Sequence, residues 1–357
     1  MDEFNIKIVR AIEEKRHGLC EAAVNRQYDL QPEIWKPYGE QGLRRSIRDA
    51  DHHFSYLIEA LLESDPSLFG GYVLWLKELF VGLKFPNDAL PVMLACTRDA
   101  LKYHLPQEMS LITDQYIQVA LGELGQQALP QPSFITEEAP LFELAREYLD
   151  ALLKGQRHLA SRLIVDSVEK GESIKEIYLN VFQRSQYEIG RLWHTNQVSV
   201  AQEHYCSAAT QLIMSQLYPY IFSTEKIGRK FVAASVGGEL HEIGIRMVAD
   251  FFELEGWDTY YMGANTPTAS ILSAVEDYQP EILGISATMP LHRSALKDLI
   301  SEVRSSDACR GVKILVGGYT LKAAPGLWQK MGADGFALDA LDATVLAAGL
   351  MSEQAAS

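Results

Sequence analysis

The 357-residue sequence is poor in several features that would each define a class of protein. Its four cysteines (Cys20, Cys96, Cys206 and Cys309) lie far apart and form no CxxC pair. This argues against a disulfide framework or a thiolate zinc site and fits a reducing compartment. No apolar run approaches the roughly 18 residues needed to span a bilayer, and the start lacks the pattern of a signal peptide. We therefore expect a cytoplasmic protein that is not inserted in a membrane.

Positive charge is scarce as well. The chain has 32 Lys and Arg against 47 Asp and Glu, a formal charge of −15. Phosphate backbones are bound by clustered Lys and Arg, so we expect no direct DNA binding. The sequence contains neither a Gly-x-Ser-x-Gly elbow nor a Gly-rich phosphate loop ending in Lys-Ser/Thr. We therefore expect that the chain is not an enzyme.

The sequence divides into regions of different periodicity, which predict a multi-domain α and α/β protein. Helical, aromatic-rich sequence is followed by a Pro-containing linker, because two close prolines disfavour helix. A second helical region has glycines where helices should stop and short connections, which favours a four-helix bundle. The predicted domains are a helical sensor domain (1–128), the linker (129–139), the bundle (140–225) and an α/β domain (226–357).

Strands and helices alternate in the last region. Strict alternation implies a parallel sheet covered on both faces, here a flavodoxin-like doubly wound fold. Ligands of such sheets bind outside the carboxyl ends of the strands. The predicted strands are 230–236, 258–263, 281–287, 313–318 and 334–338. The helix after the first strand is predicted from apolar residues at helical spacing, beginning with Leu240.

The loop after the first predicted strand reads SVGGELHEIG. It places His241 at the mouth of the sheet, and Glu239 is close enough to accept a hydrogen bond from its ring. A carboxylate that holds one imidazole nitrogen leaves the other free for a metal. Gly244 removes a side chain where a bulky ligand could pass. Taken alone, the pair is equally described as a loop histidine capped by a glutamate.

Two further loops supply small residues at neighbouring strand ends. Ser286 and Thr288 follow the third strand, and Gly317 and Gly318 follow the fourth. A ligand slot between strands needs small residues at both mouths. Gly-Gly alone is common in turns, but the three loops in this order are specific.

The helical region from 140 carries RLWHTNQVSVAQEH. Trp193 and Glu203 would lie about 15 Å apart on one continuous helix, so they can meet only if the chain turns between them. The segment 195–197 is a credible turn. The turn would bring Trp193 and His194 together with Glu203 and His204. The alternative is a core tryptophan and a solvated Glu-His pair.

These motifs together resemble cobalamin-binding domains. The resemblance rests on E-L-H-E-I-G, S-A-T, G-G and the closing GADGFALDA, with Glu239 where the family usually has Asp. It implies that His241 ligates cobalt from the lower face in place of the nucleotide base, whose tail enters the slot beside Ser286 and Gly317. The implied contacts also include Leu240, Glu242, Ile243, Gly244, Thr288 and Gly318.

The Trp, nine residues, Glu-His spacing resembles the bundle of cobalamin photoreceptors such as the light-responsive repressors of carotenoid genes. The resemblance implies that Trp193 covers the upper face of adenosylcobalamin or methylcobalamin, with Glu203 and His204 at the adenosyl group. It further implies that His194 ligates cobalt after light breaks the cobalt–carbon bond. A homodimer and a downstream signalling protein are the implied partners.

The N-terminal region shows no recognition helix of the kind those repressors carry. Its arginines suit carboxylates and its aromatics suit a flat conjugated ligand. This arrangement resembles photocobilins, which implies a globin-like domain holding a noncovalent bilin such as biliverdin. Haem, with His52, His53 or His104 as iron ligand, is the competing tetrapyrrole, and a solvated basic face beside an aromatic core is the simplest alternative. The candidate residues are Arg44, Arg45, Arg48, His52, His53, Tyr72 and Trp75.

The main functional prediction is a light sensor in which cobalamin photolysis switches the helix bundle. Two alternatives remain: a corrinoid carrier protein of a methyltransferase system, and a haem-based redox sensor. Trp193, His194, Glu203 and His204 have a role in the sensor and none in the carrier. Because the sequence given ends soon after the fifth strand, we expect no fused output enzyme.

Overall fold

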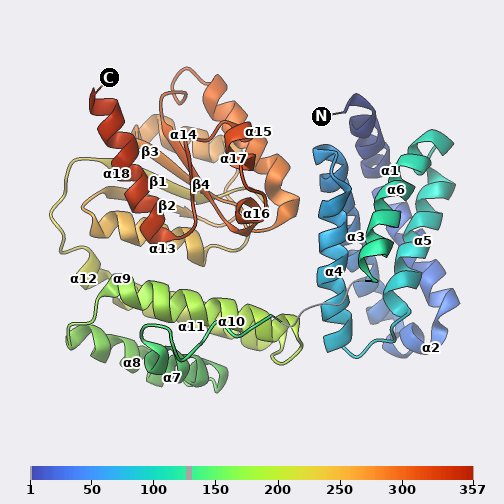
Figure 1. The fold of residues 1–357 in the computed structure, drawn as a ribbon, viewed down its shortest axis with the longest axis horizontal. Coiled ribbons are helices and arrows are strands. Elements are labelled where there is room, and N and C mark those ends of the chain that lie inside the picture. Colours follow the sequence, from blue (N-terminus) through green and yellow to red (C-terminus); the bar gives the residue numbers. More distant parts are fainter. Residues whose placement is uncertain (1, 126–130, 357) are drawn as a thin grey trace. The chain divides into compact units, whose positions relative to one another are not determined.

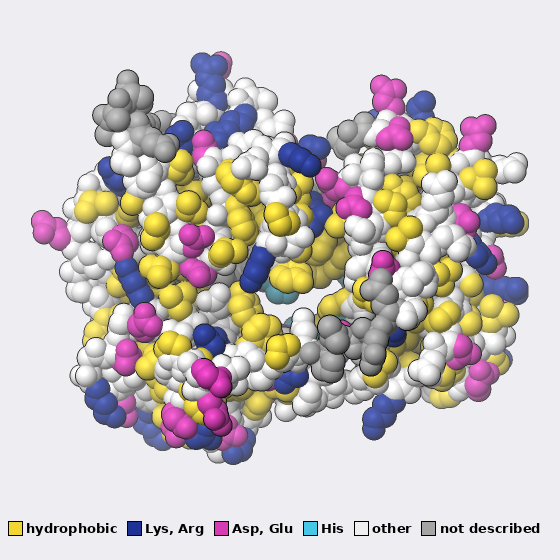
Figure 2. Space-filling model, viewed as in Figure 1, with side chains coloured by type: hydrophobic (Ala, Val, Ile, Leu, Met, Phe, Trp, Pro, Cys, Tyr) yellow, Lys and Arg dark blue, Asp and Glu magenta, His cyan; other side chains and the backbone are white. Residues whose placement is uncertain are grey.

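The computed structural model describes residues 2–125 and 131–356, and part of the predicted linker lies outside these residues. The chain forms two compact units (Figure 1). The first comprises Met1–Gln131 and Leu192–Gln197, and the second comprises Pro132–Arg191 and Val198–Ser357. A short segment from the middle of the chain therefore belongs to the N-terminal unit. On the face in Figure 2, basic side chains are scattered among acidic and apolar ones.

The N-terminal unit is helical, as predicted. Asp2 and Asp65 cap helices by accepting hydrogen bonds from backbone N–H groups of the first turn. The first long helix packs on the third and fifth, and the fourth packs on the third and sixth. Ile8, Leu57 and Ile117 are buried in the core of the N-terminal unit. The helices are α1 (Glu3–Leu30), α2 (Pro32–Trp35), η1 (Lys36–Tyr38), α3 (Gly39–Glu63), α4 (Pro66–Gly82), α5 (Ala89–His104) and α6 (Gln107–Glu123).

The second unit begins with helices at the positions predicted for the bundle. Gly155 and Gly171 follow two of them with φ of +72° and +95°, a conformation that glycine adopts without strain. Ser199 and Gln202 form a capping box at the start of α11. The helices are α7 (Phe142–Leu153), α8 (Arg157–Glu169), α9 (Ile174–Ile177), the π-helical turn η2 (Tyr178–Phe182), α10 (Gln183–His194), α11 (Val200–Gln216) and α12 (Tyr218–Ile221).

A five-stranded parallel sheet follows, in the order β2-β1-β3-β4-β5 (Figure 1). This is the order of flavodoxin-like doubly wound folds, and it agrees with the sequence prediction. The strands β1, β3 and β4 are almost completely buried because helices cover both faces, whereas the edge strand β2 is half-buried. They are β1 (Lys230–Ser235), β2 (Asp258–Gly263), β3 (Ile282–Ser286), β4 (Lys313–Gly317) and β5 (Gly335–Ala337).

The helices divide between the two faces of the sheet. Side chains of α14, α15 and α17 pack on one face, and those of α13 and α18 pack on the other. Met247 and Phe251 of α13 also enter the core formed by α7–α12. The remaining elements are α13 (Ile243–Leu254), α14 (Thr268–Tyr278), η3 (Pro290–His292), α15 (Arg293–Ser305), α16 (Tyr319–Lys322), α17 (Leu327–Met331) and α18 (Ala340–Ala356).

One sequence expectation about the last region needs correction. Leu240 is not part of the first helix: it precedes α13 and is 72% exposed. After β4 the chain forms two short helices, α16 and α17. The chain also continues after β5 into α18, a 17-residue helix that the sequence analysis did not identify. Within the described residues, none of the helices has the length and apolar character needed to cross a membrane.

Candidate functional site

The loop between β1 and α13 holds the predicted Glu-His pair. His241 Nδ1 lies 2.6 Å from Glu239 Oε1, which also accepts a hydrogen bond from the His241 backbone N–H. The Glu239 side chain is fully buried, whereas 60% of the His241 side chain is exposed. The ring is therefore held through Nδ1, and Nε2 is the nitrogen available to an outside ligand.

The other oxygen of Glu239 binds the loop after β3. Oε2 accepts hydrogen bonds from Thr288 N at 2.7 Å, Met289 N at 3.0 Å and His292 Nδ1 at 3.0 Å. Against its burial, hydrogen bonds from both histidines and from backbone N–H groups hold the pKa of Glu239 well below its usual value. The hydrogen bond to Glu239 in turn raises the pKa of His241. The sequence analysis missed His292, which is 53 residues away in the chain.

The ends of three neighbouring strands form a row of small residues. Ser235 of β1 pairs with Ser286 of β3, which pairs with Gly317 of β4. Ser235 Oγ is buried without a hydrogen-bond partner in the structure. Gly318 has φ of +110°, and a Cβ there would lie 2.1 Å from Ala287 O. Small side chains therefore line the carboxyl edge of the sheet, and the Ser235 hydroxyl there has no hydrogen-bond partner.

Three further loop residues have different surroundings. Glu242 accepts hydrogen bonds from Gln211 Nε2 of α11 at 3.1 Å and from Tyr261 OH of β2 at 2.9 Å. Ile243 packs on the core formed by α7–α12. Gly244 is exposed, and a Cβ there would meet no atom within 4 Å. Glu242 and Ile243 therefore join this loop to the bundle, and Gly244 faces open space.

Glu203 and His204 lie in the first turn of α11. His204 Nδ1 is hydrogen-bonded to Glu203, and Ser207 Oγ donates to Glu203 Oε1 at 2.9 Å. The negative charge of Glu203 contributes to the raised pKa of His241. The His204 side chain is 75% exposed. An acidic, hydrogen-bonding helix start thus lies within electrostatic reach of the exposed imidazole.

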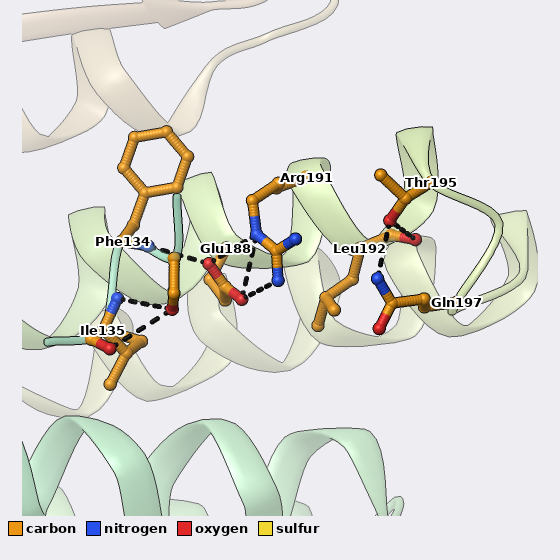
Figure 3. Close-up of polar contacts among 8 residues, drawn as sticks. Phe134, Ile135, Glu188, Arg191, Leu192, Thr195 and Gln197 are labelled. Carbon is orange, nitrogen blue, oxygen red and sulfur yellow. Dashed lines mark hydrogen bonds and ion pairs between the residues drawn. The ribbon is translucent and has the colours of Figure 1, made fainter. Parts of the chain in front are cut away.

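The predicted turn at 195–197 is present, with Asn196 at φ of +56°. Thr195 Oγ1 donates to Leu192 O at 3.3 Å and accepts from Gln197 Nε2 at 2.9 Å (Figure 3). Nearby in the sequence, Glu188 of α10 is buried and accepts hydrogen bonds from Arg191 and from Phe134 N (Figure 3).

His194 is buried within the N-terminal unit. Its Nε2–H donates to Trp75 O at 2.8 Å, and Nδ1 lies 3.4 Å from Glu78 Oε2. Its ring stacks on Trp75 with centroids 4.7 Å apart, and Trp193 lies 6.0 Å from the same indole. Asn196 Nδ2 donates to Gly82 O at 3.1 Å. Both nitrogens of His194 are therefore engaged by α4.

The tetrapyrrole candidates do not form one cluster. Four of them line a cleft of about 1290 Å³ together with residues of α1. They are Arg44, Arg45, Arg48 and His52. The cleft is not purely basic, because Glu13, Glu14, Glu21 and Asp51 line it too.

The remaining candidates lie between α3 and α4. His53 Nδ1 is hydrogen-bonded to Tyr72 OH at 2.6 Å, and burial together with nearby His52 lowers the pKa of His53 to about 4. Tyr72 stacks on Tyr56 with centroids 3.7 Å apart and on Trp75 at 6.1 Å. The candidate arginines face the cleft between α1 and α3, whereas the candidate aromatic residues pack between α3 and α4. The basic group and the aromatic group are therefore separate. His104, the other candidate iron ligand, lies at the end of α5.

The carboxyl edge of the sheet fits a corrinoid. A single imidazole with a free Nε2 suits a metal whose equatorial ligands come from a macrocycle. The small-residue row and the unpartnered Ser235 hydroxyl suit a polar chain threading between strand ends. The residues expected at the lower face thus fit the cofactor that the sequence analysis assigned.

Comparisons with known proteins find similar sequences that cover this site. Residues 229–345 match a family model described as a B12 binding domain, and residues 144–218 match a second model of the same description. A dimethylamine corrinoid protein of Methanosarcina acetivorans is 24% identical over 218 residues, covering 58% of this chain and 96% of that protein. A corrinoid protein of Desulfitobacterium hafniense is 22% identical over 212 residues, covering 58% and 97%.

A solved structure shares the fold. The monomethylamine corrinoid protein of Methanosarcina barkeri superimposes with a TM-score of 0.53 at 18% identity, covering 59% of this chain and 99% of that one. The two sequence relatives are both named as corrinoid proteins. The two matched ranges, 144–218 and 229–345, are therefore similar in sequence to B12 binding domains.

Proposed function

We propose that this protein binds cobalamin with His241 as the lower axial ligand of cobalt. The observation that carries the proposal is the Glu239–His241 pair, in which Nδ1 is held at 2.6 Å from a buried carboxylate while the ring is exposed. Glu239 fixes the tautomer that leaves Nε2 unprotonated, which is the form that a metal requires. When bound, an alkylcobalamin would supply an alkyl group that leaves when the cobalt–carbon bond is broken, either by transfer to an acceptor or by light.

Different residues of the chain would contact different parts of the corrinoid. Ser235, Ser286 and Gly317 would receive the nucleotide tail between the strand ends. Glu242, bonded to Gln211 and Tyr261, would keep the His241 loop against the bundle. Glu203 and His204 would line the opposite side.

The relatives favour a corrinoid carrier as the role, which is the alternative rather than the main prediction of the sequence analysis. Both named relatives are corrinoid proteins, and one is named for dimethylamine. In this role the protein would present a methyl group on cobalt to a methyltransferase partner. His241 would hold the methylated cofactor, and Glu239 would hold the His241 ring in place.

A specific observation favours light sensing as the second candidate role. The spacing of Trp193, Glu203 and His204 resembles that of cobalamin photoreceptors, and Glu203 is hydrogen-bonded to His204 near the start of α11. His194 would reach cobalt in this role only after its bonds to Trp75 and Glu78 are broken. A homodimer and a downstream signalling partner belong to this candidate.

Absorption spectra of the protein loaded with methylcobalamin or adenosylcobalamin test these proposals. Binding in the form without the nucleotide base, lost in His241→Ala, supports the lower-ligand assignment; unchanged binding in that variant refutes it. Rapid loss of the alkyl group under green light without substrate favours sensing. A light-stable methyl group that is transferred only with a partner enzyme favours the carrier. An unchanged photoproduct spectrum in His194→Ala excludes His194 as the ligand formed in light.

For the N-terminal unit we propose a tetrapyrrole site, with biliverdin as the first ligand to test and haem as the second. The support is the cleft between α1 and α3, where Arg44, Arg45 and Arg48 could pair with propionates. Binding that is weakened by Arg45→Ala and Arg48→Ala supports the site. Equal binding to the triple variant at residues 44, 45 and 48 contradicts it.

A further inference from the structure

His292 contacts the candidate site from a different loop. It is the last residue of η3, just before α15, and is 9% exposed. Its Nδ1–H donates to Glu239 Oε2 at 3.0 Å, while His241 Nδ1–H donates to Oε1 at 2.6 Å. One buried carboxylate therefore holds two imidazoles, one exposed and one buried.

The five hydrogen bonds to Glu239 are divided between its two oxygens. Oε1 accepts from the backbone and ring of His241, and Oε2 accepts from Thr288 N, Met289 N and His292. A buried carboxylate is costly unless its lone pairs are satisfied. His292 is the one side-chain donor among the three groups that bind Oε2; the other two are backbone N–H groups. Replacing His292 therefore weakens the hydrogen bonding of Oε2, while Oε1 still accepts from His241.

Gly238 makes room for the His292 ring. A Cβ at this position would lie 3.1 Å from His292 Nε2 and 3.5 Å from Cδ2. Gly238 also has φ of +84°, which favours glycine. Gly238 therefore leaves space for the second imidazole as well as forming the turn, and the loops after β1 and β3 are in contact here.

We propose that His292 is a positioning residue for His241, acting through Glu239; this rests on the proposed cobalamin site. A glutamate has one more rotatable bond than the aspartate usual at this place, so it loses more conformational entropy when fixed. Anchoring Oε2 to His292 and to two backbone N–H groups confines that extra torsion. The carboxylate then presents Oε1 to His241 in one orientation.

Three variants of the full-length chain test the proposal. His292→Leu removes the donor, His292→Gln keeps a donor of similar reach, and His158→Leu on α8 is the matched control, because His158 is exposed. The first readout is the NMR signal of the His241 Nδ1 proton in protein without cobalamin. We expect a low-field, slowly exchanging signal that is lost in His292→Leu and retained in the other two variants.

The second readout uses cobalamin itself. His292→Leu should bind about tenfold more weakly, since loss of a group that orients a metal ligand typically costs 10–100-fold. The nitrogen splitting in the electron paramagnetic resonance spectrum of bound cob(II)alamin should weaken as well. His292→Gln should restore binding to within about threefold of the wild type. Gly238→Ala, which displaces the His292 ring, should reproduce the effect of His292→Leu.

The outcomes separate this proposal from the proposed function. If the wild type binds cobalamin through His241 and His292→Leu keeps its proton signal, affinity and nitrogen splitting, then His292 has no positioning role. If the wild type shows no nitrogen splitting from His241, the proposed ligation of cobalt by His241 is refuted. If His292→Gln behaves like His292→Leu although both are folded, the hydrogen bond is not the cause of the effect.

Discussion

Two histidines in different regions of this molecule show how surroundings decide what an imidazole can do. His241, at the carboxyl edge of the sheet, has Nδ1 held by Glu239 and a side chain that is 60% exposed. His194, in the N-terminal unit, is 6% exposed and has both nitrogens engaged by Trp75 and Glu78. The first ring is exposed and is held through Nδ1 alone, whereas the second is buried and held through both nitrogens.

Replacing each histidine should give the largest contrast. His241→Ala should weaken cobalamin binding in the dark on the order of a thousandfold, roughly 4 kcal/mol, because the axial ligand is lost. His194→Ala should leave dark binding within about threefold. Titration of cobalamin-free protein, followed by absorption, measures both. Equal losses in the two variants would contradict the distinction drawn between them.

Two Glu-Arg ion pairs, each between residues three positions apart in a helix, allow buried and exposed charges to be compared. Glu188 is buried beside Arg191, with side-chain exposures of 6% and 16%, whereas Glu143 and Arg146 are exposed at 70% and 54%. Glu188→Ala should lower the free energy of unfolding by about 3 kcal/mol, because the ion pair with Arg191 and the acceptor for Phe134 N are removed from a buried position. Glu143→Ala should change it by less than about 0.5 kcal/mol. Urea denaturation of both variants checks this.

Replacing Trp75, whose indole stacks on His194, should have a smaller effect on stability. Trp75→Ala removes the stack on His194 and the contact with Trp193, so the N-terminal unit should lose about 2 kcal/mol of stability. Val81→Ala on the same helix is the control, because Val81 is 64% exposed. Thermal unfolding followed by circular dichroism measures both. A Trp75→Ala variant as stable as Val81→Ala would mean that the stack does not hold the segment.

The smallest effect is a pH dependence in the second unit. Burial raises the pKa of Asp250, which accepts a hydrogen bond from Tyr178, to about 6. The folded state therefore retains a proton that the unfolded state has lost, and stability falls as pH rises from about 4 to about 6. Between pH 5 and pH 7 the free energy of unfolding should fall by about 1 kcal/mol from this group. Asp250→Asn should remove that part of the slope in urea titrations at several pH values.

Local patterns were enough to predict much of the second unit. Each of the five strands was predicted within about two residues, because short apolar runs alternate with helical sequence. The Glu239–His241 hydrogen bond could also be predicted, since it joins residues two positions apart. The turn at 195–197 was predicted from its polar residues, and the structure contains it.

Contacts between distant segments could not be predicted in the same way. His292 reaches Glu239 from 53 residues away, and His194 reaches Trp75 from 119 residues away. The sequence analysis considered Trp193 and His194 only together with Glu203 and His204, and it did not foresee their contacts with Trp75. It also treated the N-terminal arginines and aromatics as one cluster, although they lie on different sides of α3.

The sequence by itself determined the parallel sheet, the loop that carries Glu239 and His241, and the small residues at the strand ends. These follow from side-chain periodicity and from spacings of a few residues, which the chain cannot easily violate. Only the tertiary structure decided that Glu239 holds a second imidazole and that His194 is stacked on Trp75. Both contacts depend on which faces of distant elements meet, and that is fixed by burial of the whole core rather than by any local pattern.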